Sequence, residues 1–127
     1  MVDYDGEDLE LVAARVVVEV EGAQARAVVT NTGEATWLGS SVQRGAVHLG
    51  VQRIDRAGRV RDLDFLRVAL HDDPAAVVET GEVREVRFAI PPHDDDVLAF
   101  DLVAEGVAWF AGLGTSRVEV VRREATP

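Results

Sequence analysis

The sequence contains no cysteine and no lysine, and aromatic residues make up only 6% of its 127 residues. Without cysteine the chain can form no disulfide, no thiolate metal site and no thiol nucleophile. All of its basic side chains are arginines, which we interpret as a compositional bias rather than a binding device. No apolar run approaches the roughly 18 residues of a membrane-spanning helix. The acidic start, residues 1–5, has no apolar signal segment. We therefore expect a soluble, cytoplasmic protein.

The formal net charge of −10 decides against a nucleic-acid partner, because an acidic surface repels phosphate backbones. The length corresponds to about one domain. Hydrophobic residues make up 47% of the chain, enough for one core. We predict an acidic N-terminal arm at 1–10, a single domain at 11–122 and a C-terminal tail at 123–127.

Apolar residues recur at every second position along most of the chain, which is the spacing of half-buried β-strands. The pattern predicts strands at 11–20, 24–31, 47–54, 60–70, 83–90, 97–103 and 117–121, and a short edge strand at 77–78. Turn signals separate these segments. This regular series is typical of an immunoglobulin-like antiparallel β-sandwich of about seven to eight strands. A change of phase within 60–70 predicts a bulge or a corner where the strand switches sheets.

The stretch from Phe100 to Phe110 organises the rest of this fold. Phe100 and Leu102 share one face of a strand that breaks at Glu105-Gly106, and two adjacent aromatics, Trp109 and Phe110, follow. Neighbouring residues of a strand point to opposite faces. We therefore expect at least one of these two rings in the core and the other directed outward.

The sequence offers no recognisable catalytic residues, and we predict that the protein is not an enzyme. Ser40, Ser41 and Ser116 lack the G-x-S-x-G context of a hydrolase nucleophile. Gly112-Leu113-Gly114 is an isolated G-x-G without a following helix. Asp101 and Glu105 are the nearest candidates for a glycosidase pair, but acids directed toward solvent are the more typical case.

Two loops combine histidine with aspartate, His71-Asp72-Asp73 and His93-Asp94-Asp95-Asp96. If they met at one end of the sandwich, their carboxylates could bind Ca²⁺. Aspartate also favours turns, because its side chain bonds nearby backbone amides. We adopt this second interpretation and predict neither a metal nor a cofactor.

Carbohydrate binding is the more specific of the non-enzymatic hypotheses, because sugar rings stack on aromatic side chains while carboxylates and arginine bind the hydroxyls. The candidate ligand-binding residues are Trp109, Phe110, Trp37, Asp101 and Glu105. Of these we expect Trp37 to fill the end of the core.

Several short motifs resemble a known family. They are Asn31-Thr32-Gly33 with Trp37, the segment 47–51, Thr80-Gly81-Glu82, Pro91-Pro92 and the segment 100–110. From about residue 16 to residue 121 the chain resembles the immunoglobulin-like accessory domains of bacterial glycosyltransferases and methyltransferases. More loosely, it is similar to the glycan-binding C-terminal domain of O-antigen ABC transporter ATPases. The resemblance implies a sandwich fold and a role in glycan recognition, and it supplies no catalytic residues.

These observations favour a non-catalytic binding module that recognises a carbohydrate or a glycan-processing partner. One alternative is a structural or assembly domain that contacts another protein through a sheet edge or an apolar face. A small hydrolase is the third hypothesis, and it ranks last because no nucleophile or ligand set is visible.

Overall fold

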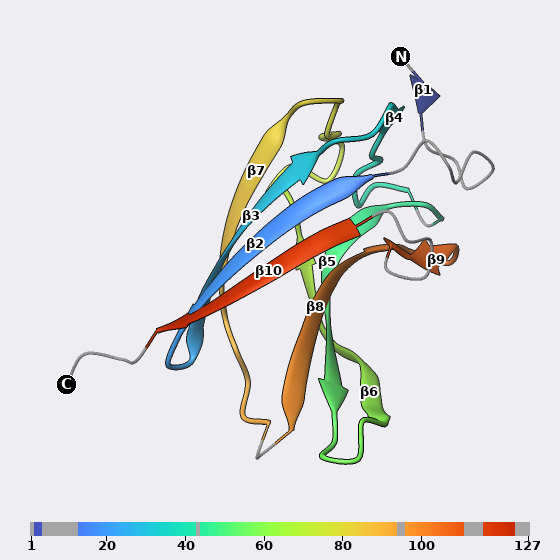
Figure 1. Cartoon of the computed structure of the whole chain (residues 1–127). Coiled ribbons are helices and arrows are strands. Elements are labelled where there is room, and N and C mark those ends of the chain that lie inside the picture. The colour runs from blue at the N-terminus through green and yellow to red at the C-terminus, as the bar shows by residue number, and fades with distance from the viewer. Residues whose placement is uncertain (1, 4–12, 43, 94–95, 111–115, 124–127) are drawn as a thin grey trace.

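The computed structural model describes residues 2–3, 13–42, 44–93, 96–110 and 116–123. Their strands form two four-stranded β-sheets that face each other and one short two-stranded sheet (Figure 1). The strands are β1 (Val2–Asp3), β2 (Ala14–Glu21), β3 (Gln24–Asn31), β4 (Ala35–Thr36), β5 (Val47–Ile54), β6 (Val60–Ala69), β7 (Val83–Ala89), β8 (Val97–Ala104), β9 (Ala108–Trp109) and β10 (Ser116–Arg123). The predicted all-β sandwich is confirmed. Most of the predicted arm and tail lies outside the described residues. Within the described part, no helix has the length and hydropathy needed to cross a bilayer.

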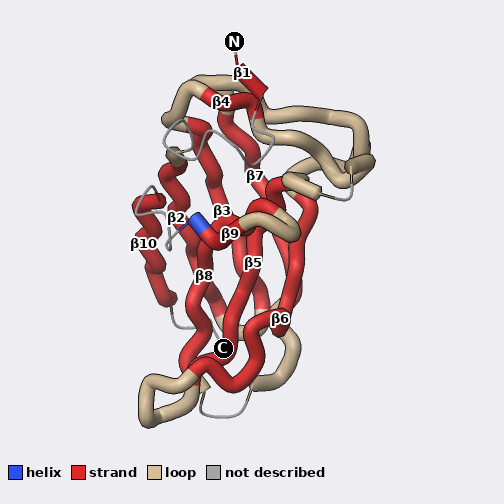
Figure 2. Tube along the Cα trace, turned by 90° about the vertical axis from the view of Figure 1, so that its right-hand side faces the viewer, coloured by secondary structure: helices blue, strands red, loops and turns tan. Residues whose placement is uncertain are grey.

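The first sheet has the strand order β10-β2-β3-β7, and the second has the order β6-β5-β8-β9. Figure 2 views the second sheet, with β9 beside the upper end of β8. The runs β2-β3-β7 and β6-β5-β8 follow the A-B-E and C′-C-F orders of immunoglobulin sandwiches. The last strand departs from that order, because β10 lies beside β2 and runs parallel to it. The short β1-β4 pair is parallel as well, and the other strand pairs of the described residues are antiparallel, as predicted.

Period-two burial explains why these segments form strands. In the β2–β3 hairpin, Val16, Val18 and Val20 face the core from β2, and Ala27 and Val29 face it from β3. The hairpin turns at Gly22, whose φ of 59° suits a residue without a Cβ. The bounds predicted for β3 and β5 match the observed strands.

The core between the sheets is closed at one end by two aromatic rings. Trp37 and Phe110 are both fully buried, and their ring centroids lie 5.7 Å apart in an edge-to-face arrangement. Offset geometry of this kind is favourable for aromatic pairs. The expectation that Trp37 belongs to the core is therefore confirmed, and of the adjacent pair it is Phe110 that turns inward.

The change of phase predicted within 60–70 is a β-bulge. Val51 pairs with Leu66, but Arg53 pairs with Asp62, so β6 carries extra residues between these two partners. The Asp62 carboxylate accepts a hydrogen bond from the Asp64 amide inside the bulge. The strand pairs with β5 on both sides of the irregularity, so it stays in one sheet rather than switching sheets.

Asn31 joins three segments at the upper end of the first sheet. Its fully buried side-chain amide donates to the carbonyls of Ala35 and Val78, each at 2.9 Å, and its side-chain oxygen accepts from the Gly33 amide at 3.1 Å. Gly33 is not among the glycines with a positive φ, so the left-handed backbone preference of Asn and Gly does not explain this turn. The asparagine side chain explains it, since it satisfies backbone groups that the turn leaves in the interior.

We expect Asn31→Ala to lower the free energy of unfolding by about 2–4 kcal/mol, because each buried polar group left without a partner costs ~1–3 kcal/mol. Urea unfolding followed by far-ultraviolet circular dichroism measures the change. Thr32→Ala alters an exposed neighbour in the same turn and is the matched control, with an expected effect below about 0.5 kcal/mol. Equal destabilisation by the two variants would contradict the role given to Asn31.

Candidate ligand-binding face of the second sheet

The outer face of the second sheet carries the side chains that point away from the core. In β5 the odd-numbered residues from 47 to 51 are buried, so His48 and Gly50 point outward. The strand register places Gly50 between Asp101 of β8 and Arg67 of β6. Trp109 of β9 pairs with Val103 at the edge of the same sheet. Residues far apart in the sequence therefore lie in neighbouring rows of one surface.

Gly50 is the residue that lets Trp109 lie against the sheet. A Cβ atom at position 50 would be 2.5 Å from Cη2 and 2.6 Å from Cζ3 of the Trp109 ring. These distances are shorter than any van der Waals contact, so only glycine fits beneath the indole. Arg67 stacks on the ring, with its Cζ atom 4.7 Å from the ring centroid. This is a cation–π contact that holds both side chains in place.

A chain of polar contacts starts from the same arginine. Arg67 Nη2 lies 2.6 Å from Asp64 Oδ1, and Arg67 Nε lies 3.2 Å from Glu105 Oε2. The same Glu105 oxygen lies 3.0 Å from His48 Nδ1, and His48 Nε2 lies 2.9 Å from Ser40 Oγ. Glu105 is thus shared between a guanidinium and an imidazole, and this fixes the position of its carboxylate.

Beside these residues the surface forms a shallow groove of about 290 Å³. Its walls include Trp109, Arg67, Asp64, Glu105 and Gly106. The groove combines one aromatic ring, one cation and two carboxylates within a single concavity. An aromatic wall with a few convergent polar groups is a feature of small-molecule sites.

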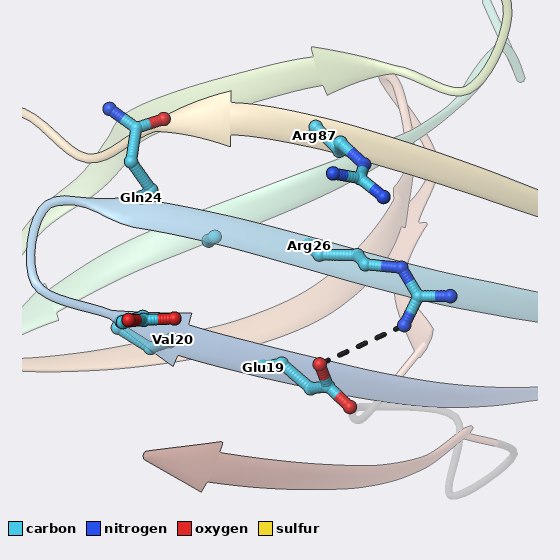
Figure 3. A pocket seen from close by; sticks show the side chains of 7 residues that line it. Glu19, Val20, Gln24, Arg26 and Arg87 are labelled. Atoms are coloured by element: carbon cyan, nitrogen blue, oxygen red, sulfur yellow. Dashed lines mark ion pairs between the residues drawn. The ribbon is translucent and has the colours of Figure 1, made fainter. Parts of the chain in front are cut away.

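A larger hollow of about 540 Å³ lies on the outer face of the first sheet, where Glu19 of β2 and Arg26 of β3 face each other (Figure 3). Arg26 is 3.8 Å from Glu19 and 2.6 Å from Glu85. The hydrogen bond from Arg26 holds the pKa of the Glu85 carboxyl below its usual value. Among the residues that the structure describes, no aromatic side chain lines this hollow, whereas Trp109 lines the groove on the second sheet. We therefore place the candidate site at the groove on the second sheet.

The five residues suggested by the sequence divide between the outer face of the second sheet and the core. Trp109 and Glu105 line the groove, and Asp101 lies in the neighbouring row of the same face, 7% exposed. Trp37 and Phe110 are buried in the core, where a ligand on this face cannot reach them.

Sequence reasoning missed the partners Arg67, Asp64, Gly50 and His48. The outward phase of His48 and Gly50 was readable from the alternation of β5. Nothing local indicated that Arg67 would reach Glu105, because that contact depends on the pairing of β6 with β5 and of β5 with β8.

The two histidine–aspartate loops show turn-stabilising contacts. Asp73 accepts a hydrogen bond from the Ala75 amide, as expected for an aspartate in a turn. Asp96 binds Arg53 at 2.9 Å and Arg61 at 3.3 Å. Burial acts to raise the pKa of Asp96, but the hydrogen bonds from Arg61 and Arg53 outweigh it and lower the pKa. Among the residues that the structure describes, which exclude 94 and 95, no group of three potential ligands could hold a metal ion.

Comparisons with family models, with curated proteins and with solved structures found no match for this chain. The fold and the groove therefore define the protein as an all-β sandwich with a candidate ligand-binding face. The family resemblance seen in the motifs stays a prediction.

We expect Gly50→Ala to displace the Trp109 ring, because the new methyl group would occupy the position of its benzene edge. In a Trp37→Phe background Trp109 is the only tryptophan, so its fluorescence reports the change directly. Acrylamide quenching should increase, and the free energy of unfolding should fall by about 1–3 kcal/mol.

Gln52→Ala changes the next outward residue of β5 and serves as the control, with quenching unchanged. Identical quenching in the Gly50→Ala variant would show that the indole does not depend on the missing side chain at position 50.

Proposed function

We propose that this sandwich is a binding module that holds a carbohydrate in the groove beside Trp109. The observation that carries the proposal is the grouping of a half-buried indole with a guanidinium and two carboxylates in one concavity. The apolar face of a sugar ring contacts aromatic and aliphatic surface, while its hydroxyl groups donate to carboxylates and accept from arginine. The groove offers each of these partners within the reach of one or two sugar units.

The charge balance of the groove favours a neutral ligand over an anion. Arg67 is already paired with Asp64 and Glu105, so the site has no surplus positive charge. The chain as a whole carries −10, and its field opposes the approach of a phosphate or a carboxylate. A polyhydroxylated ligand can add hydrogen bonds to the existing ion pairs without breaking them.

Isothermal titration against a panel of neutral oligosaccharides tests the proposal. We expect at least one sugar to bind, and Trp109→Ala to weaken that binding at least tenfold, which corresponds to about 1.4 kcal/mol. Gln52→Ala, on the same face but outside the groove lining, is the control and should bind as the unmodified chain does. If no sugar in the panel gives heat, the carbohydrate proposal is abandoned.

An assembly domain is the second candidate function, and an exposed apolar row on the same sheet favours it. Ile54 of β5 pairs with Val60 of β6 on one side and with Val97 of β8 on the other. Val60 is 52% exposed and Val97 is 57% exposed. Three adjacent branched aliphatic side chains on one face form a patch that a second protein surface could cover.

Sedimentation velocity over a range of concentrations tests the assembly function. If the row mediates self-association, the unmodified chain should form dimers as the concentration rises, and Val97→Asp should return it to the monomer, because a charge in the patch opposes burial. Val83→Asp places the same charge on an equally exposed valine of the first sheet and should leave the dimer intact. A chain that remains monomeric at every concentration would exclude self-association through this row.

A further inference from the structure

Ser40, His48 and Glu105 come from three separate segments and form one hydrogen-bonded chain. Ser40 lies in the loop that follows β4, His48 on β5 and Glu105 in the turn after β8. Ser40 Oγ is 2.9 Å from His48 Nε2, and His48 Nδ1 is 3.0 Å from Glu105 Oε2. The order is hydroxyl, imidazole, carboxylate, with each ring nitrogen contacting one partner. This is the arrangement by which serine hydrolases activate a hydroxyl group.

The Glu105 carboxylate determines which ring nitrogen of a neutral His48 carries the proton. Because Glu105 can only accept a hydrogen bond, a neutral His48 keeps its proton on Nδ1. The lone pair of Nε2 then points to Ser40 Oγ, which is the tautomer that a general base requires. Arg67, at 3.2 Å from the same carboxylate oxygen, fixes its orientation and acts as a positioning residue.

The loop that carries Ser40 packs against the loop that contains Pro74. The Ser41 amide donates to the Pro74 carbonyl at 2.8 Å. A Cβ atom at Gly39 would be 2.5 Å from the same carbonyl oxygen, so the close approach of the two loops depends on glycine. Ser40 itself is exposed, and the His48 side chain retains 17% of its surface. An electrophile in solution can therefore reach the hydroxyl group without a change of fold.

We propose that Ser40 is a nucleophile that accepts short acyl groups from esters, with His48 as the general base and Glu105 as its orienting acid. Ser40 Oγ attacks the ester carbonyl carbon while its proton passes to His48 Nε2. The C–O bond to the alcohol then breaks, the alcohol takes that proton, and the acyl group stays on Ser40. Water completes the cycle by the same proton transfers and releases the carboxylic acid. This activity goes beyond the proposed binding function.

The hollow beside Ser40 is too small to bind a long acyl chain. The hollow next to Ser40, walled by Gly39, Val47 and Leu70, has a volume of only about 10 Å³, roughly the space of one water molecule. A long acyl chain would find no apolar channel there, whereas an acetyl group needs none. Since the described residues around Ser40, which exclude residue 43, form no deep pocket for a tetrahedral oxyanion, we expect acylation of Ser40 to be easier to detect than rapid turnover.

Reaction with a fluorophosphonate probe tests the proposal, because attack by an activated serine expels fluoride and leaves a stable phosphonyl ester that peptide mass spectrometry can locate. We expect a single label on Ser40 in the folded chain. His48→Gln should slow the labelling about a hundredfold, the usual contribution of a general base. Ser41→Ala removes the adjacent exposed hydroxyl and is the matched control, with labelling unchanged.

Two further readouts separate a nucleophile from a purely structural contact. The labelling rate of the unmodified chain should rise with pH through one ionisation, and His48→Gln should remove this dependence. Circular dichroism of the His48→Gln variant establishes that it is folded. Equal labelling of Ser40 and Ser41, an unlabelled folded chain, or a rate that His48→Gln leaves unchanged would each overturn the proposal.

Discussion

The reversal at Glu105-Gly106 is the constraint on which both the core and the outer face depend. Gly106 adopts a φ of 73°, in the left-handed region where a residue without a Cβ is unstrained. The backbone of Glu105 is bonded on both sides, since its amide donates to the Ala46 carbonyl and its carbonyl accepts from the Gly45 amide. The turn is thereby fixed to the start of β5. The chain leaves it in the direction that puts Trp109 outside the sandwich and Phe110 inside.

This division of two adjacent rings connects stability to the candidate site. Phe110 closes the core against Trp37, and its burial fixes the direction of the backbone at position 109. Phe110 follows the last residue of β9, and Trp109, which pairs with Val103 of β8, places its indole on the outer surface. Gly50 provides the space for the ring, and Arg67 stacks on it. The aromatic wall of the groove is therefore a consequence of core packing.

The fold could be predicted from the sequence to a greater extent than the site. Alternation of apolar residues located β2, β3, β5, β7 and β8, and a break in the alternation located the bulge in β6. The alternation could not predict that β10 lies parallel to β2, because the choice of a neighbouring strand depends on contacts between distant segments. The same limit applies to the site. Trp109 and Glu105 were candidates from local pattern, whereas Arg67 and Ser40 join them only through tertiary contacts.

The position of Glu105 gives a physical route by which binding and reactivity could influence each other. One oxygen of its carboxylate contacts both Arg67, in the groove, and His48, in the chain that ends at Ser40. A ligand hydroxyl group that accepts a hydrogen bond from Arg67 shares the guanidinium with this carboxylate, and so weakens their contact without breaking it. Weakening the contact with Arg67 leaves more of the carboxylate charge to His48, which strengthens the hydrogen bond at Nδ1. A ligand held beside Trp109 would in this way favour proton transfer from Ser40. Glu105 is the residue that connects the groove with the hydrogen-bonded chain of Ser40.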